Sequence, residues 1–202
     1  MSLSNAHSDG LVVLPVHREV KTIKNFSESH FIAGAQDHFR VEKIIVDSND
    51  ETLVRTMVKQ ISTVKAETRI AAEYVIVHDG VPEDPTARNY WVRYKDYIKN
   101  DVYPDMSKEY CNLDIVALNK LIIEDVFHID EEKYEDYVHS TRSYESCYKD
   151  IQDGKYDIMF IMNPVRVEQI RNITAMGERL PEVTISVFPK PSVGVIINLK
   201  ED

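Results

Sequence analysis

The chain has 202 residues, of which 43% are hydrophobic and 29% are charged, as is typical of a globular protein with one hydrophobic core. The formal net charge of -10 and the pI near 5.2 argue against a general nucleic-acid binder or a protein of anionic membrane surfaces. No apolar run reaches the roughly 18 residues of a membrane helix and no secretion signal is visible, so we expect a cytoplasmic protein without membrane or nucleic-acid partners.

We expect one domain over residues 1–202, in which residues 1–10 are partly disordered or derived from cloning. Cys111 and Cys147 do not form a disulfide framework and are expected to be free thiols.

The first half of the chain alternates strand-like and helix-like segments. Residues 11–16 are apolar and β-branched, which predicts a strand that ends near Pro15. Residues 70–77 and 90–94 predict a hairpin with a long loop around the turn cluster 79–85. A further strand is predicted at 41–46, and helices are predicted at 27–39, with Ser27 as N-cap, and at 51–65.

The second half is dominated by a predicted helix over residues 113–127, in which Ile115, Leu118, Ile122 and Val126 form an apolar stripe. Asn112 or Asp114 is the predicted cap of this helix. Residues 156–162 are apolar on both faces, which is typical of a central strand. Further helices are predicted at 143–152 and 165–176, and strands at 138–140, 183–187 and 193–198, the last two as a second hairpin. The pattern predicts a mixed α/β to α+β fold, one compact domain with helices packed on a mixed sheet.

The C-terminal segment, residues 158–199, holds the most suggestive polar residues. Asn163 suits the N-cap of the predicted helix and Pro164 suits its first position, so free backbone N–H groups there form an anion site. Arg166 follows in the first turn, where a cation opposes the helix dipole unless an acidic group or a bound anion compensates it. Arg171 lies about 140° around the helix, so the two arginines do not hold one ligand from a single face.

Beyond this helix, Gly177 suits a left-handed C-cap, and Arg179 and Lys190 follow as further cations. These cations either help to bind an anion or form an internal network with Glu178 that holds the C-terminal segment to the core. The sequence leaves both interpretations open.

A second candidate site follows the first predicted strand, at His17 and Arg18. The ends of strands often face ligand crevices, where His17 serves as an acid or base and Arg18 holds an anionic group. The alternative is a packed histidine beside a surface arginine, because no nucleophile or base partner is identifiable.

Complete catalytic and metal-binding motifs are missing from the sequence. It has no GxGxxG, no Walker loop and no GxSxG, and its histidines and cysteines show no HxxxH or CxxC spacing. Catalytic residues and cofactors are therefore unknown, and no metal is expected.

Three blocks of the sequence, in order along the chain, resemble parts of one family. Residues 9–18, DGLVVLPVHR, are similar to "GLvilPtHR", and residues 113–118, LDIVAL, are similar to "LDvavLh". Residues 163–190 resemble "NPtrveqvravadaGErMPqKSTfFyPKl", and the ending resembles "tGlvinpl". These patterns belong to the C-terminal half of the bacterial and archaeal domain-of-unknown-function family numbered 1015.

The chain departs from this family pattern at the "MPqKST" stretch, where Val183 replaces the lysine and Thr184 replaces the serine. Val16 replaces a threonine in the first block. If the missing lysine contacts a ligand in relatives, this chain has lost that contact, which argues against an active site here.

The resemblance also implies a partner. Full-length members carry an upstream half with an "aDGHHRy" block, which this sequence does not contain. That block is similar to one in the sulfiredoxin and partitioning-protein superfamily, which includes nucleotide-using free-serine kinases. The resemblance therefore implies the C-terminal portion of a longer phosphotransferase or nucleotide-handling enzyme, inactive without its N-terminal half.

Two functions remain open on the sequence. In the first, the chain is the half of a larger enzyme that binds an anionic small molecule or nucleotide, through His17, Arg18, Asn163, Arg166, Arg179 and Lys190. In the second, it is a structural or interaction domain that mediates packing or forms a homodimer and has no ligand of its own. Convergence of these side chains on one open cleft would distinguish the first function from the second.

Overall fold

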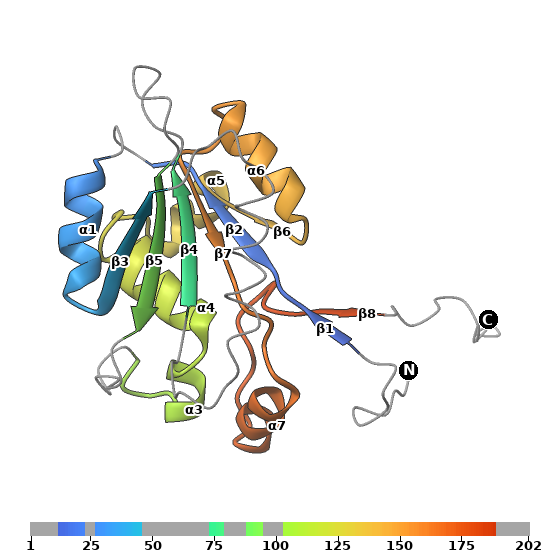
Figure 1. The fold of residues 1–202 in the computed structure, drawn as a ribbon. Coiled ribbons are helices and arrows are strands. Elements are labelled where there is room, and N and C mark those ends of the chain that lie inside the picture. Colours follow the sequence, from blue (N-terminus) through green and yellow to red (C-terminus); the bar gives the residue numbers. More distant parts are fainter. Residues whose placement is uncertain (1–11, 23–26, 46–72, 79–87, 95–102, 189–202) are drawn as a thin grey trace.

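A computed structural model describes residues 12–22, 27–45, 73–78, 88–94 and 103–188, and Figure 1 shows its elements. The strands are β1 (Val12–Leu14), β2 (His17–Val20), β3 (Phe39–Ile45), β4 (Glu73–His78), β5 (Arg88–Tyr94), β6 (Val138–Thr141), β7 (Ile158–Ile161) and β8 (Ser186–Phe188). The helical elements are α1 (Glu28–Gln36), α3 (Lys108–Cys111), α4 (Asp114–Ala117), the π-helix η1 (Leu118–Glu124), the 3-10 helix η2 (Glu131–Lys133), α5 (Tyr134–Tyr137), α6 (Tyr144–Gln152) and α7 (Val167–Ala175).

The described strands form two sheets. Six of them follow the order β3-β5-β4-β7-β2-β6, and β1 pairs with β8 in a separate two-stranded ribbon. Every described pair is antiparallel, including the predicted hairpin of β4 and β5. Figure 1 shows the ribbon extending away from the larger sheet, with α7 at the same end of the molecule. The mixed α/β class expected from the sequence is confirmed.

Strand β7 lies inside the larger sheet between β4 and β2, and all four of its residues are buried. Ile158 and Phe160 face the main core, whereas Met159 and Ile161 face a second, smaller core beneath α6. Because successive side chains of a strand point to opposite faces, both faces of the sheet are covered by helices. The central strand predicted at residues 156–162 is therefore confirmed.

The main core is built around the continuous helical stretch of α4 and η1. Its predicted stripe, Ile115, Leu118, Ile122 and Val126, is buried throughout. Full burial of each such side chain stabilises the fold by roughly 1.5–3 kcal/mol. The stretch changes to π-type hydrogen bonding at Leu118, which the apolar pattern does not encode.

Of the three helix N-caps predicted from the sequence, one agrees with the structure, Ser27 of α1. The side chains of Ser27 and Ser143 accept hydrogen bonds from backbone N–H groups in the first turns of α1 and α6. The cap of α4 is Leu113, without a side-chain hydrogen bond, so the prediction of Asn112 or Asp114 is wrong. The cap of α7 is Arg166, so the prediction of Asn163 is also wrong.

The strand predicted at residues 11–16 is β1, which ends just before Pro15, as expected. Pro15 and Val16 separate β1 from β2, and the two strands belong to different sheets. The predicted strand at 183–187 becomes β8, whose described partner is β1. The predicted helix at 51–65, the turn at 79–85 and the strand at 193–198 lie outside the described residues, so the second hairpin stays a prediction.

The segment after α7 is held to α3 by Glu178. Its carboxylate accepts hydrogen bonds from the backbone N–H of Ser107, at 2.6 Å, and from the Ser107 hydroxyl. The same hydroxyl accepts a bond from the Tyr110 N–H and caps α3. Glu178 thus anchors the segment through Ser107, and the described Arg179 is exposed without an ion pair to it, which corrects that part of the predicted network.

Replacing Glu178 with alanine should lower the unfolding free energy by about 2 kcal/mol, because two hydrogen bonds to a half-buried carboxylate are lost. Urea unfolding measures this loss. The matched control is Glu182→Ala, since Glu182 is exposed on the same segment and its replacement should change stability by less than about 0.5 kcal/mol. Equal losses in the two variants would contradict the anchoring role.

Candidate functional site

The candidate site begins with three consecutive buried polar residues, His17, Arg18 and Glu19, in strand β2. The expected strand-end position of His17 and Arg18 is wrong, because β2 runs inside the sheet and pairs with both β6 and β7. Alternation along the strand places Arg18 on the main-core face and the other two on the α6 face. The expected alternative of a surface arginine is wrong too, since Arg18 is 1% exposed.

The Arg18 guanidinium is enclosed by neutral oxygens. Nε donates to the Tyr134 hydroxyl at 3.3 Å, and Nη1 donates to the carbonyls of Val16 and His17 at 3.3 and 3.2 Å. Nη2 donates to the carbonyl of Val183 at 2.9 Å. Within the described part of the chain, no carboxylate forms an ion pair with Arg18, so its charge is solvated but not neutralised.

Tyr134 links Arg18 to the π-helix η1 of the main core. Its hydroxyl accepts from Arg18 and donates to Asn119 Oδ1 in η1 at 3.0 Å. Arg18 is therefore positioned from both sides, by Tyr134 and by the segment that carries Val183.

His17 is a neutral hydrogen-bond acceptor in this structure. The backbone N–H of Met162, just after β7, donates to His17 Nδ1 at 3.1 Å, so the ring proton is on Nε2. Burial, and then the nearby positive charge of Arg18, lower the pKa of His17 to about 4, against a smaller opposing effect of Glu145. At neutral pH the ring therefore holds the end of β7 against the start of β2.

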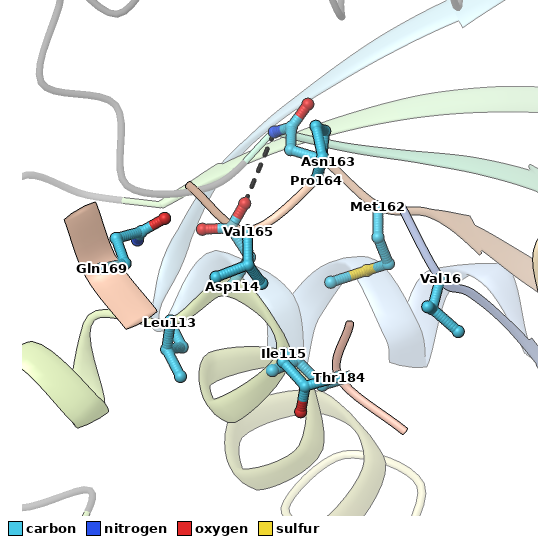
Figure 2. A pocket seen from close by; sticks show the side chains of 10 residues that line it. All are labelled: Val16, Leu113, Asp114, Ile115, Met162, Asn163, Pro164, Val165, Gln169 and Thr184. Atoms are coloured by element: carbon cyan, nitrogen blue, oxygen red, sulfur yellow. Dashed lines mark hydrogen bonds between the residues drawn. The ribbon is translucent and has the colours of Figure 1, made fainter. Parts of the chain in front are cut away.

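A small hollow lies beside this pair, at the end of β7 (Figure 2). It has a volume of about 20 Å³, which is room for one water-sized group. Asn163 Nδ2 donates to Asp114 Oδ2 at 3.4 Å at its rim. The lining comes from residues 113–115 and 162–165 together with Val16, Gln169 and Thr184.

The predicted site residues divide into two groups. His17 and Arg18 are buried together, and Asn163 lines the hollow near them. Arg166 and Arg179 are exposed, so the structure does not gather the described cations in one open cleft. Lys190 lies outside the described residues.

Arg166 has a structural partner at the start of α7. Gln169 Oε1 accepts from the backbone N–H of Arg166 at 3.0 Å and from its Nε at 3.4 Å. Because Gln169 also lines the hollow, Arg166 lies next to the hollow although it does not line it. On α7 itself, Arg171 is exposed.

Sequence reasoning missed Glu19 and its partner His139 on the α6 face. Glu19 is 0% exposed, its Oε2 lies 2.6 Å from His139 Nδ1, and its Oε1 has no hydrogen-bond partner. Burial, and then Glu19, raise the pKa of the neighbouring Cys147 thiol, which argues against a nucleophilic cysteine. A usable signal was present in the sequence: three polar residues in a row between Val16 and Val20.

The described residues contain no group of three or more His, Cys, Asp or Glu side chains that could hold a metal ion. None of the helices in that same part of the chain is long and apolar enough to cross a membrane.

A scan of the chain against protein-family models gave no match, and searches among curated proteins and solved structures returned no similar chain. The resemblance to the family numbered 1015 therefore stays a prediction that depends on its three sequence blocks.

The pKa of His17 gives a pH dependence of stability. Its folded value of about 4 lies below the ordinary value of 6.5, so the unfolded chain binds the proton first and stability is lost as pH falls through this range. The full difference corresponds to about 3 kcal/mol. In His17→Asn the side-chain Oδ1 still accepts the N–H of Met162, but the titrating imidazole is gone. We therefore expect urea unfolding to show a much smaller loss of unfolding free energy between pH 7 and pH 4 in this variant. His30→Asn, which replaces an exposed histidine, should lose as much unfolding free energy as the unmodified protein. Equal losses in His17→Asn, His30→Asn and the unmodified protein would contradict this role of His17.

Proposed function

We propose that this chain is the ligand-binding half of a larger enzyme and that the hollow in Figure 2 receives the anionic group of a small molecule or nucleotide. The observation that supports this is the meeting of the three sequence blocks at the hollow. Val16 belongs to the first block and residues 113–115 to the second, whereas Asn163 and Thr184 belong to the third.

The positive charge that attracts the anion is that of the Arg18 guanidinium. This guanidinium does not line the hollow, but it bonds the carbonyl of Val16, which does, and the carbonyl of Val183, next to the lining residue Thr184. A buried cation without a counter-ion is costly, and a bound anion would offset that cost. The neutral His17 adds no second charge at neutral pH.

The volume of about 20 Å³ suits one small group of a ligand. The remainder of the ligand would then extend past the start of α7, where Arg166 is exposed. By family resemblance the complete enzyme is phosphotransferase-like, its catalytic groups lie in the upstream half, and this chain alone is inactive.

Thermal-shift measurements with phosphate, ATP and phosphoserine test this function. A ligand that binds only the folded state raises the melting temperature with its concentration. Arg166→Ala should reduce that rise, because the cation beside the hollow is lost. The matched control is Arg171→Ala, the other exposed arginine of this helix region, which should leave the rise intact. No rise with any anion, or equal reductions in both variants, would contradict the proposal.

A second candidate function is favoured by the ribbon of β1 and β8. Val12, Leu14 and Phe188 are exposed large apolar side chains of this ribbon, and Phe188 is 61% exposed. A two-stranded ribbon is marginally stable by itself, and a free strand edge is a template for pairing. Among the described strands, β1 and β8 pair only with each other. In this alternative the ribbon pairs with the same ribbon of a second copy, and the chain is an interaction domain.

Analytical ultracentrifugation over a concentration series tests the ribbon. We expect a dimer that Phe188→Ser weakens, because the most exposed apolar side chain of the ribbon is removed. Met176→Ser is the control, since Met176 is similarly exposed at the end of α7, outside the ribbon. If the protein is monomeric at every concentration, pairing of the ribbon with a second copy is wrong.

A further inference from the structure

The bond between Arg18 and Val183 differs from the other bonds of this guanidinium. Two acceptors of Arg18, the carbonyls of Val16 and His17, belong to its own segment of chain, and the Tyr134 hydroxyl is fixed to Asn119. The Val183 carbonyl comes from a segment 165 residues away in the sequence and makes the shortest contact, 2.9 Å. Among the described residues it is also the only hydrogen-bond partner of Nη2, which carries two N–H groups.

Val183 holds its position in a costly backbone conformation. Its φ is 50°, in the left-handed region, where a β-branched residue is a genuine outlier. Its side chain is 55% exposed, so burial of that side chain does not compensate. Strained residues persist where surrounding contacts hold them, and such residues cluster at ligand sites. Here the contacts are the Arg18 bond and the neighbouring Thr184, whose hydroxyl donates to the Pro181 carbonyl.

We infer that the Val183 carbonyl occupies the position of a ligand carboxylate, which displaces it from Arg18 Nη2 and opens the hollow beside Thr184. This inference rests on the proposed function and names the ligand class of the same site. Displacement leaves both N–H groups of Nη2 available to the carboxylate and releases Val183 from its strained conformation. It also accounts for a hollow that is small while the carbonyl is in place.

Charge matching selects a carboxylate over a phosphate dianion. The buried groups offer one positive charge, that of Arg18, because His17 is neutral at physiological pH. The Asp114 carboxylate already lines the hollow. A monoanion balances Arg18, whereas a second negative charge would be buried near Asp114 without a partner. Arginine also matches the planar carboxylate geometry.

The test uses variants at position 183 that differ in their tolerance of a positive φ. Val183→Gly and Val183→Asn relieve the strain of the closed conformation, whereas the β-branched Val183→Thr keeps it. In Val183→Gly and Val183→Asn the closed conformation is therefore more stable, and a ligand that displaces the carbonyl must overcome this added stability. We expect sodium acetate and sodium glycolate to bind these two about tenfold more weakly than the unmodified protein or Val183→Thr.

Binding is followed by NMR titration of the Arg18 Nε–H and Thr184 amide signals at constant ionic strength, with sodium chloride as reference and sodium phosphate as the competing class. If no anion moves these signals in the unmodified protein, the proposed function and this inference both fail. If carboxylates bind all four proteins equally, the displacement of Val183 is wrong while anion binding stands. If phosphate binds more tightly than acetate, the ligand class is wrong.

Discussion

The burial of Arg18 is the constraint on which the arrangement of this end of the molecule depends. The guanidinium is reached by oxygens from its own strand, from Tyr134 and from the segment that carries Val183. Each missing bond would leave a buried donor of a charged group unsatisfied, at a cost of about 1–3 kcal/mol or more. The network therefore fixes where the segment after α7 crosses β2, and through Tyr134 it also fixes the π-helical stretch that carries Asn119. The ribbon follows from this crossing, because Val183 precedes β8 by only a few residues.

Strand β2 carries opposite charges on its two faces. Arg18 lies in the main core, and Glu19 is fully buried under α6 with His139 as its hydrogen-bond partner. The two side chains point to opposite faces of the sheet, so they form no ion pair with each other and each is held by partners of its own. The Glu19 carboxylate acts on its surroundings by raising, after burial itself, the pKa of Cys147 and of Tyr156. The Cys147 thiol and the Tyr156 phenol therefore stay protonated at neutral pH, which argues against a nucleophilic role for either group.

The sequence predicted those features that depend on local pattern. The doubly apolar strand around Phe160, the stripe that includes Leu118, and the left-handed Gly177, with φ 78°, are all present. It failed where a distant partner decides the outcome. Pro15 ends β1 as predicted, but the pattern did not show that the chain enters the larger sheet at His17 as β2, where β6 and β7 supply hydrogen bonds to both of its sides. Asn163 has the chemistry of a cap, but its side chain is used by Asp114 instead. The buried state of Arg18 was missed for the same reason, since its acceptors lie up to 165 residues away.

His17 connects the protonation state of the chain to the shape of the hollow. Its Nδ1 accepts the N–H of Met162, and Met162 and Asn163 both line the hollow. Protonation at Nδ1 would set a donor against a donor, break this bond and place a second buried charge beside Arg18. The lowered pKa keeps that state away from neutral pH, so residues 162–165 stay against β2. His17, which the sequence suggested as an acid or base, thus acts as a hydrogen-bond acceptor. It contributes to the proposed binding site by staying uncharged, while Arg18 supplies the only buried cation of the described β2 strand.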